Sequence, residues 1–289
     1  MQFKIYFITV PLVLSTLTYI ITSQFIPLYT AFSIVAPGNG EQISSPNNEL
    51  NNFSRILGGT AGQAAMSPTE MAKLIIKSEF FLKGFIQKYN LEPELLAINS
   101  YDKSNNLLIT DTSKFNPKTK EWLAKEPEYQ NPQLRLNMAY MNLNSKLSVV
   151  DDRFTGATTI TLDTPSPTLS VKWLNLLIEE VNFLLKSKKK SEYQRQISFL
   201  ENELLKRTDT EGRNMIYDLI FSTTNKLMMV DSTNSFALES VASAYPPLKP
   251  SSPRKVLISF AFFIFGLILV TIIAFLKIYL KQQEKHFHE

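Results

Sequence analysis

The chain of 289 residues carries a formal net charge of +4, two histidines and no cysteine. The lack of cysteine excludes disulfides and thiolate chemistry, and a histidine-based triad or metal site in the body of the chain is excluded because His286 and His288 both lie in the terminal tail. Nucleic acid is not an expected partner, since the basic excess lies at the ends of two apolar runs, as Lys4, Arg254, Lys255, Lys277, Lys281 and Lys285.

Residues 5–26 and 256–276 are uncharged and apolar, and each is long enough for a helix to cross a bilayer, which takes about 20 apolar residues. We predict two transmembrane helices there, flanking a periplasmic domain at 27–255, with cytoplasmic ends at 1–4 and 277–289. A signal peptide is the competing interpretation of the first run, although its apolar part is longer than a usual signal core and no A-x-A-like cleavage site follows. Lysines near both termini favour cytoplasmic ends, whereas the basic pair before the second run argues against this placement.

After the first run, residues 29–36 have the composition and alternation of a strand. The sequence SPTE at 67–70 combines an N-cap, a proline suited to the first helical position and the acidic member of a capping box. Apolar spacing carries the predicted helix from there to about Tyr89. Two short helices are then predicted around 119–124 and 132–144.

Residues 147–152 and 156–162 read as two strands joined by a turn. Asp151 and Asp152 form a tempting acidic pair for general acid–base work. Neighbouring side chains in a strand point to opposite faces, however, so these two cannot converge on one atom. Turn chemistry is the better interpretation.

A long helical pattern covers about 169–207, where a helix would be about 58 Å long. A second helix at about 211–230 is predicted to run back along it, and a strand at 236–244 returns the chain to the membrane. The predicted class is therefore α+β, with an α/β base near the membrane and a long extended helical hairpin.

The long helix contains a cationic run without an apolar residue, KSKKKSE at 186–192. A solvated face is the common interpretation of such a run, and the aromatic residues nearby are usually packing. The alternative is a cationic belt, repeated in an oligomer, that contacts a glycan. Its candidate residues are Lys186, Lys188, Lys189, Lys190, Trp173 and Tyr193.

No pattern typical of an enzyme is present. Gly58-Gly59 lacks the lysine of a phosphate-binding loop, and there is no G-x-S-x-G or calcium-loop spacing. We therefore predict no catalytic residues, no cofactor and no metal.

Several segments taken in order resemble the polysaccharide co-polymerases, the Wzz chain-length determinant family of bacterial inner membranes. They are PLYTAFSIVAP after the first run, ILGG at 56–59 leading to a helix, GATTITLDTPSP leading into the long helix, and SVASAYPPLKPSSPRK entering the second run. The last of these carries the proline-rich motif of the family, which this chain matches with Pro246, Pro247, Pro250, Ser252, Pro253, Arg254 and Gly266. Val270 stands where a second glycine is usual.

The resemblance implies a ring-shaped homo-oligomer that sets the length of a surface polysaccharide made by a Wzy-type polymerase, such as lipopolysaccharide O-antigen, without catalysis by this chain. The predicted partners are further copies of itself, the polymerase, the nascent polysaccharide and the lipid bilayer. We expect the motif residues to set subunit packing and polymerase contact, since a glycine notch lets a neighbouring helix come close. The alternatives are an inner-membrane capsule export protein that works with an ABC transporter and, less favoured, a two-span periplasmic sensor.

Overall fold

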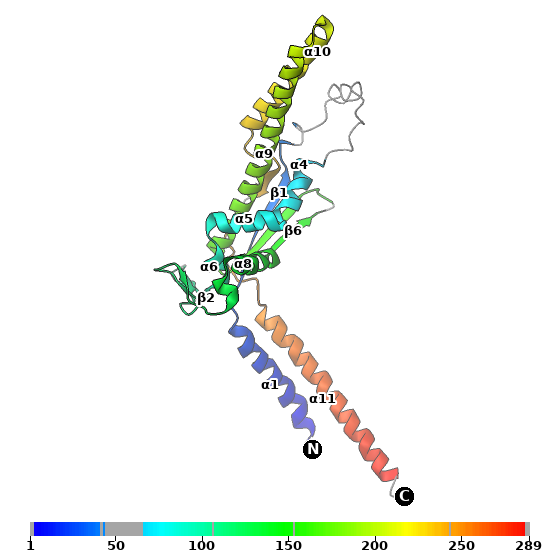
Figure 1. Cartoon of the computed structure of the whole chain (residues 1–289). Coiled ribbons are helices and arrows are strands. Elements are labelled where there is room, and N and C mark those ends of the chain that lie inside the picture. The colour runs from blue at the N-terminus through cyan, green and yellow to red at the C-terminus, as the bar shows by residue number, and fades with distance from the viewer. Residues whose placement is uncertain are drawn as a thin grey trace.

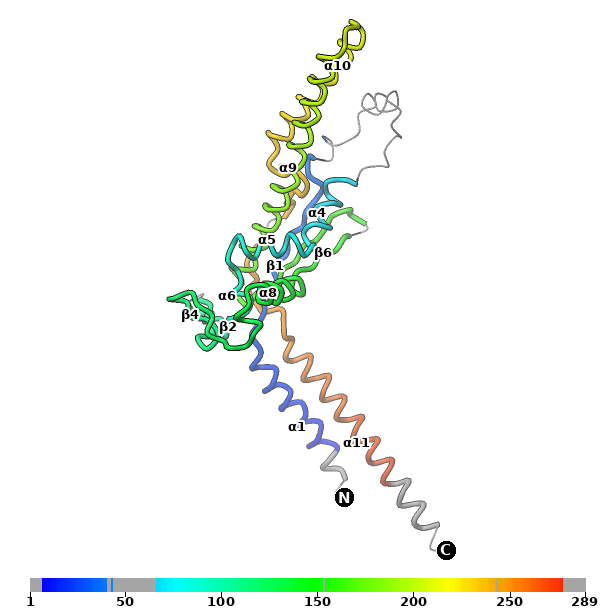
Figure 2. The backbone as a smooth tube through the Cα atoms, viewed as in Figure 1, coloured from blue at the N-terminus to red at the C-terminus, as the bar shows by residue number. Residues whose placement is uncertain are grey.

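The computed structural model describes residues 3–40, 43, 66–105, 107–152, 154–242 and 244–286. A mixed helix-and-strand base lies in the middle, two helices leave one end of it side by side, and a helical hairpin projects from the other end (Figure 1; Figure 2). The ILGG segment at 56–59 and most of the loop expected at 37–52 lie outside the described residues.

The base is built on one four-stranded antiparallel sheet in the order β6-β7-β1-β8. These strands are β6 (Leu147–Asp151), β7 (Thr158–Thr164), β1 (Tyr29–Pro37) and β8 (Leu238–Ala242), close to the positions that the sequence predicts. Every second residue of β1 and β7 is buried, and the register pairs Ala31 with Leu162 and Ser33 with Ile160. One face of the sheet is therefore covered while the other stays partly exposed.

Helices cover the buried face. They are α4 (Pro68–Ile76), α5 (Glu79–Tyr89), α6 (Glu92–Leu96), α8 (Pro132–Lys146) and the first half of α9 (Pro167–Lys206), while the short α7 (Pro127–Gln130) packs against α8. Their apolar side chains join those of the sheet in one core. The single helix predicted from residue 67 to Tyr89 is wrong, because Ser78 ends one helix and begins another. Its hydroxyl oxygen accepts a hydrogen bond from the Phe81 backbone N–H at 3.3 Å and so caps α5.

Two small hairpins lie beside α6 and α8. The first pairs β2 (Ile98–Asp102) with β3 (Leu107–Thr110), and the second pairs β4 (Phe115–Asn116) with β5 (Glu121–Trp122). The short helix predicted around 119–124 is therefore wrong. The Asn116 side-chain oxygen accepts the backbone N–H of Lys118 at 3.0 Å, and Lys120 is left-handed at φ 59, which closes a turn instead of a helix.

The hairpin consists of α9 and α10 (Thr210–Ser232). The 40 residues of α9 correspond to about 60 Å. Asn182 fixes its lower half to the sheet: its amide oxygen accepts the N–H groups of Ala237 (2.9 Å) and Leu238 (2.8 Å), and its amide nitrogen donates to the Leu238 carbonyl (2.8 Å). Near the tip, a small separate cluster of Leu200, Ile216 and Leu219 joins the two helices.

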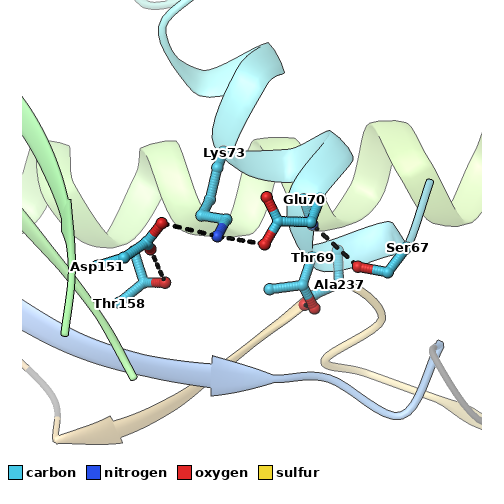
Figure 3. Close-up of polar contacts among 7 residues, drawn as sticks. All are labelled: Ser67, Thr69, Glu70, Lys73, Asp151, Thr158 and Ala237. Carbon is cyan, nitrogen blue, oxygen red and sulfur yellow. Dashed lines mark hydrogen bonds and ion pairs between the residues drawn. The ribbon is translucent and has the colours of Figure 1, made fainter. Parts of the chain in front are cut away.

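Lys73 on α4 connects this helix to the β6–β7 hairpin (Figure 3). Its ammonium group pairs with Glu70 and lies 3.0 Å from Asp151, which also accepts from the Thr158 hydroxyl at 2.7 Å. These partners, Thr158 first, hold the pKa of Asp151 below its usual range. Asp152 instead accepts the backbone N–H of Phe154 at 2.9 Å. Asp151 and Asp152 therefore stabilise the β6–β7 turn and its contact with α4, as the turn interpretation predicts.

At the other end of the base, α1 (Phe3–Ser23) packs along α11 (Lys255–His286). Within the described residues, one helical segment is long and apolar enough to cross a membrane, Lys255–Lys277. The apolar part of α1, Phe7–Ser23, is shorter.

Candidate functional site

The candidate site identified in the sequence is the proline segment, residues 246–254, which connects β8 to α11. It is fastened to the start of β1 by a short antiparallel bridge between Leu28 and Ser252. The Leu28 N–H donates to the Ser252 carbonyl at 2.8 Å, and the Ser251 N–H donates to the Leu28 carbonyl at 2.8 Å. The Ser251 hydroxyl also accepts the Thr30 N–H at 3.2 Å. The two points where the chain leaves the base are therefore tied together.

The prolines shape this connection because they have no N–H to donate. The serines between them supply the donors that the bridge needs. Pro246, Pro250, Ser252 and Arg254 are exposed, whereas Pro247 and Pro253 are half-buried. Most of the proline segment thus presents a free surface where the base meets α11.

Gly266 lies where α11 packs closely against α1. A Cβ atom at this position would stand 2.8 Å from the Pro11 Cα and 3.2 Å from the Leu14 side chain. Such a distance to backbone is too short for any other residue without a shift of one helix. Val270, four residues later, is buried. The predicted notch exists, and it is occupied by α1 of the same chain.

The lysines of the cationic run largely serve the hairpin itself. Lys186 donates to the carbonyls of Asp231 (2.9 Å) and Thr233 (2.7 Å), and Lys190 pairs with the Asp231 carboxylate at 2.8 Å. These contacts satisfy the carbonyl end of α10, where a cation is favourable. Lys189 pairs with Glu192 at 3.1 Å, and Lys188 is exposed.

Trp173 and Tyr193 are core residues, with exposed fractions of 3% and 4%. The Tyr193 hydroxyl donates to the Ile43 carbonyl at 3.1 Å. Neither ring offers a face to solvent, so the expectation that they contact a glycan is wrong. The packing interpretation of these helical aromatic residues is the right one.

The outer surface of the hairpin carries an apolar stripe on α10, formed by Tyr217, Phe221 and Met228. These residues are 50%, 70% and 57% exposed. Their spacing of four and seven residues places them on one face of the helix, opposite the side that packs on α9. Exposed apolar residues that line up in this way are typical of an interaction surface.

A pocket of about 760 Å³, which no sequence pattern predicts, opens between α5, α6, α8 and the two small hairpins. Its polar lining includes Glu92, Glu94 and Arg135, and its aromatic lining includes Phe115 and Trp122. The Arg135 guanidinium lies 2.5 Å from Glu92 and 5.1 Å from the centre of the Trp122 ring. No sequence motif marks these residues, because they lie far apart in the chain and come together only when the three helices and two hairpins fold around the pocket.

Glu94 is the unusual group in this pocket. Its Oε2 atom is shielded from solvent and makes no hydrogen bond in the described structure. Burial raises the pKa of this carboxyl group, against weaker opposing effects of its own backbone N–H and of Lys172. A shielded acceptor without a donor costs free energy. As for metals, no group of three or more Asp, Glu or His residues among those described is placed to hold an ion.

The solved structures to which this chain is similar include two polysaccharide co-polymerases. The first is described as a full-length bacterial polysaccharide co-polymerase, with 12% identity, a TM-score of 0.43 and coverage of 96% of this chain and 95% of that one. The second is a fragment of WzzB, a polysaccharide co-polymerase from Salmonella Typhimurium, with 12% identity, a TM-score of 0.32 and coverage of 78% and 100%. Both descriptions name the family that the sequence motifs resemble. No family model and no curated protein sequence matches the chain.

Proposed function

We propose that this chain is a non-catalytic polysaccharide co-polymerase that regulates the length of a surface polysaccharide made by a Wzy-type polymerase. One observation carries the proposal: the two helices at the chain ends leave the same side of the base, while a hairpin formed by the second half of α9 and by α10, a helix of 23 residues and about 35 Å, projects from the other side. This shape suits a membrane-anchored scaffold. The ordered set of sequence motifs supplies the link to polysaccharide.

In this proposal α1 and α11 both cross the bacterial inner membrane, with both termini in the cytoplasm and residues 27–255 in the periplasm. The packing of α1 against α11 at Gly266 supports two membrane crossings, because a helix that packs along a membrane-spanning helix lies in the same bilayer. The bridge between Leu28 and Ser252 gives further support, since it joins the residues that follow α1 to the segment that precedes α11.

The chain would act as a homo-oligomer, with protomers held upright by their membrane helices. The apolar stripe of Tyr217, Phe221 and Met228 supports a second copy as the occupant of this surface. Membrane anchoring places the stripes of neighbouring protomers at the same height, where burial of apolar area favours association.

The proline segment is the proposed contact with the polymerase, which is itself a membrane protein in this account. Pro246, Pro250 and Arg254 are exposed where the base meets α11, next to the proposed membrane surface. Pro-rich segments lose little conformational entropy on binding, because their backbone is already restricted.

The test is a deletion of the gene in its host, followed by separation of the surface polysaccharide on a gel. We expect the clustered length distribution to become random in the deletion strain and to be restored by the wild-type gene. An unchanged ladder would refute the assignment. Loss of all surface polysaccharide would instead favour the export role.

A further inference from the structure

The pocket at the base has the properties of a small-ligand site. We propose that it binds a single neutral sugar unit of a glycan, between the Trp122 ring and the carboxylate of Glu94. Its volume of about 760 Å³ lies in the range of small-molecule sites, which combine apolar walls with a few polar groups that fix orientation. The choice of a sugar rests on the proposed function, whereas the pocket and its chemistry do not.

The aromatic side of the pocket is held rigidly. The centres of the Trp122 and Phe115 rings lie 5.0 Å apart, and the centre of the Tyr129 ring lies 5.6 Å from that of Trp122. The Arg135 guanidinium, fixed by Glu92 and by the Tyr129 carbonyl (2.8 Å), lies over the Trp122 ring. Trp122 stays partly exposed where it lines the pocket, and the open part of a ring fixed in this way can receive the C–H face of a sugar with little loss of conformational freedom.

The polar side contains an acceptor that the protein leaves unused. The Glu94 Oε2 atom is shielded from water and has no hydrogen-bond partner in the described chain. Because this oxygen is shielded from water, a sugar hydroxyl reaches it only when the Glu94 carboxyl group turns toward the pocket that it lines. The hydroxyl is then a compact donor that satisfies the oxygen, and an uncharged ligand adds no further charge to the pocket.

The charges in the pocket disfavour an anion. Arg135 is already paired with Glu92 at 2.5 Å, and Glu94 would repel a phosphate or carboxylate ligand. Lys120, which also lines the pocket, is exposed and its charge is screened by solvent. The four ionisable groups sum to no net charge when all are ionised, which fits a neutral polyhydroxyl ligand.

The position of the pocket gives it access to a glycan that is held near the membrane. The β2–β3 hairpin beside it lies at the same end of the base as α1 (Figure 1). The Tyr101 ring on β2 makes an edge contact with Tyr29, the first residue of β1, at 5.6 Å. The pocket is therefore attached to the part of the base where the chain leaves α1.

Tryptophan fluorescence can report ligand binding, because the chain has only two tryptophans. Trp122 lines the pocket and Trp173 is buried in the core. The experiment uses purified full-length protein in detergent, as wild type and as Trp173→Phe. Each protein is titrated separately with four probes: methyl glycosides of neutral hexoses, oligosaccharides released by mild acid from the host's surface glycan, vesicles containing a neutral glycolipid, and inorganic phosphate. We expect saturable changes in Trp122 emission with sugars and none with phosphate. The oligosaccharide and vesicle arms distinguish a glycan chain from a lipid headgroup as the source.

Glu94→Ala should weaken sugar binding about tenfold or more, as expected when a hydrogen bond to a charged group is lost. Glu128→Ala, an exposed α7 carboxylate outside the pocket, should bind like wild type. A wild-type protein that folds but shows no sugar response, or one that responds to phosphate, would overturn the proposal, and so would equal binding by the two variants. The polysaccharide ladder of the deletion strain is a separate measurement, so failure of this site leaves the chain-length proposal standing.

Discussion

Asn182 is the point at which the long helix is fixed to the sheet, and its replacement by leucine tests that attachment. The side chain is 8% exposed and makes three hydrogen bonds of 2.8 to 2.9 Å to the backbone of Ala237 and Leu238. A buried hydrogen bond contributes about 1 kcal/mol net, and leucine leaves the backbone partners of Asn182 without these bonds. We therefore expect Asn182→Leu to lower the free energy of unfolding by about 3 kcal/mol.

The assay is thermal unfolding of the detergent-solubilised protein, followed by circular dichroism. A loss of about 3 kcal/mol corresponds to about 6–12 °C in a domain of this size. Asn175→Leu is the matched control, because Asn175 lies two turns earlier on α9, is half-buried and makes no side-chain hydrogen bond to the described part of the chain. Equal melting temperatures for the two variants would refute the role assigned to Asn182.

Three further predictions concern other parts of the molecule. Gly266→Ala should destabilise the protein, because the new Cβ atom meets the Pro11 backbone. Gly84→Ala should instead stabilise it by about 0.5–1 kcal/mol, because Gly84 lies within a helix and has open space around it. Thermal unfolding that ranks the two variants in the opposite order would contradict the packing of α1 against α11. Phe221→Glu should reduce the oligomer mass measured by light scattering without a change in helix content, and Phe80→Glu, at a phenylalanine 87% exposed on α5, should not; equal masses would exclude the stripe as a subunit contact. Glu94→Gln should raise stability at pH 7, because burial raises the pKa of this carboxyl above its ordinary value of 4.5 and the ionised form therefore destabilises the fold. That gain should vanish below about pH 4.5, where the carboxyl is protonated in both states, and a gain independent of pH in denaturant titrations would rule out this cause.

Elements with strong local signals were predictable from the sequence. The alternation in β1, the turn between β6 and β7 and the apolar spacing in α9 and α10 each follow from residues close together in the chain. The break at Ser78 was missed, because the apolar spacing continues through it and hides a second N-cap. The two-residue strands β4 and β5 are too short for any alternation to be visible.

The same distinction between local signals and contacts distant in the chain applies to the candidate site. Gly266 was identifiable as a notch, but the sequence did not reveal that α1 of the same chain fills it. The tertiary partners of Lys186 and Lys190 lie more than 40 residues away on α10, so the role of these lysines at the end of that helix was not predictable. Trp173 and Tyr193 illustrate a limit of helical patterns, since burial depends on which elements pack against each face. The pocket around Glu94 lies between three helices and two hairpins that are separate in the chain, so no local sequence pattern predicts it.

The central claim is that this chain regulates polysaccharide length through assembled protomers. The most direct measurement is the length distribution of the surface polysaccharide in the deletion strain, complemented with the wild-type chain or with the Phe221→Glu variant at equal expression. We expect a clustered distribution with the wild type and a shifted or random one with the variant. A random distribution with both chains, or the same clustered distribution with both and with the empty vector, would contradict it.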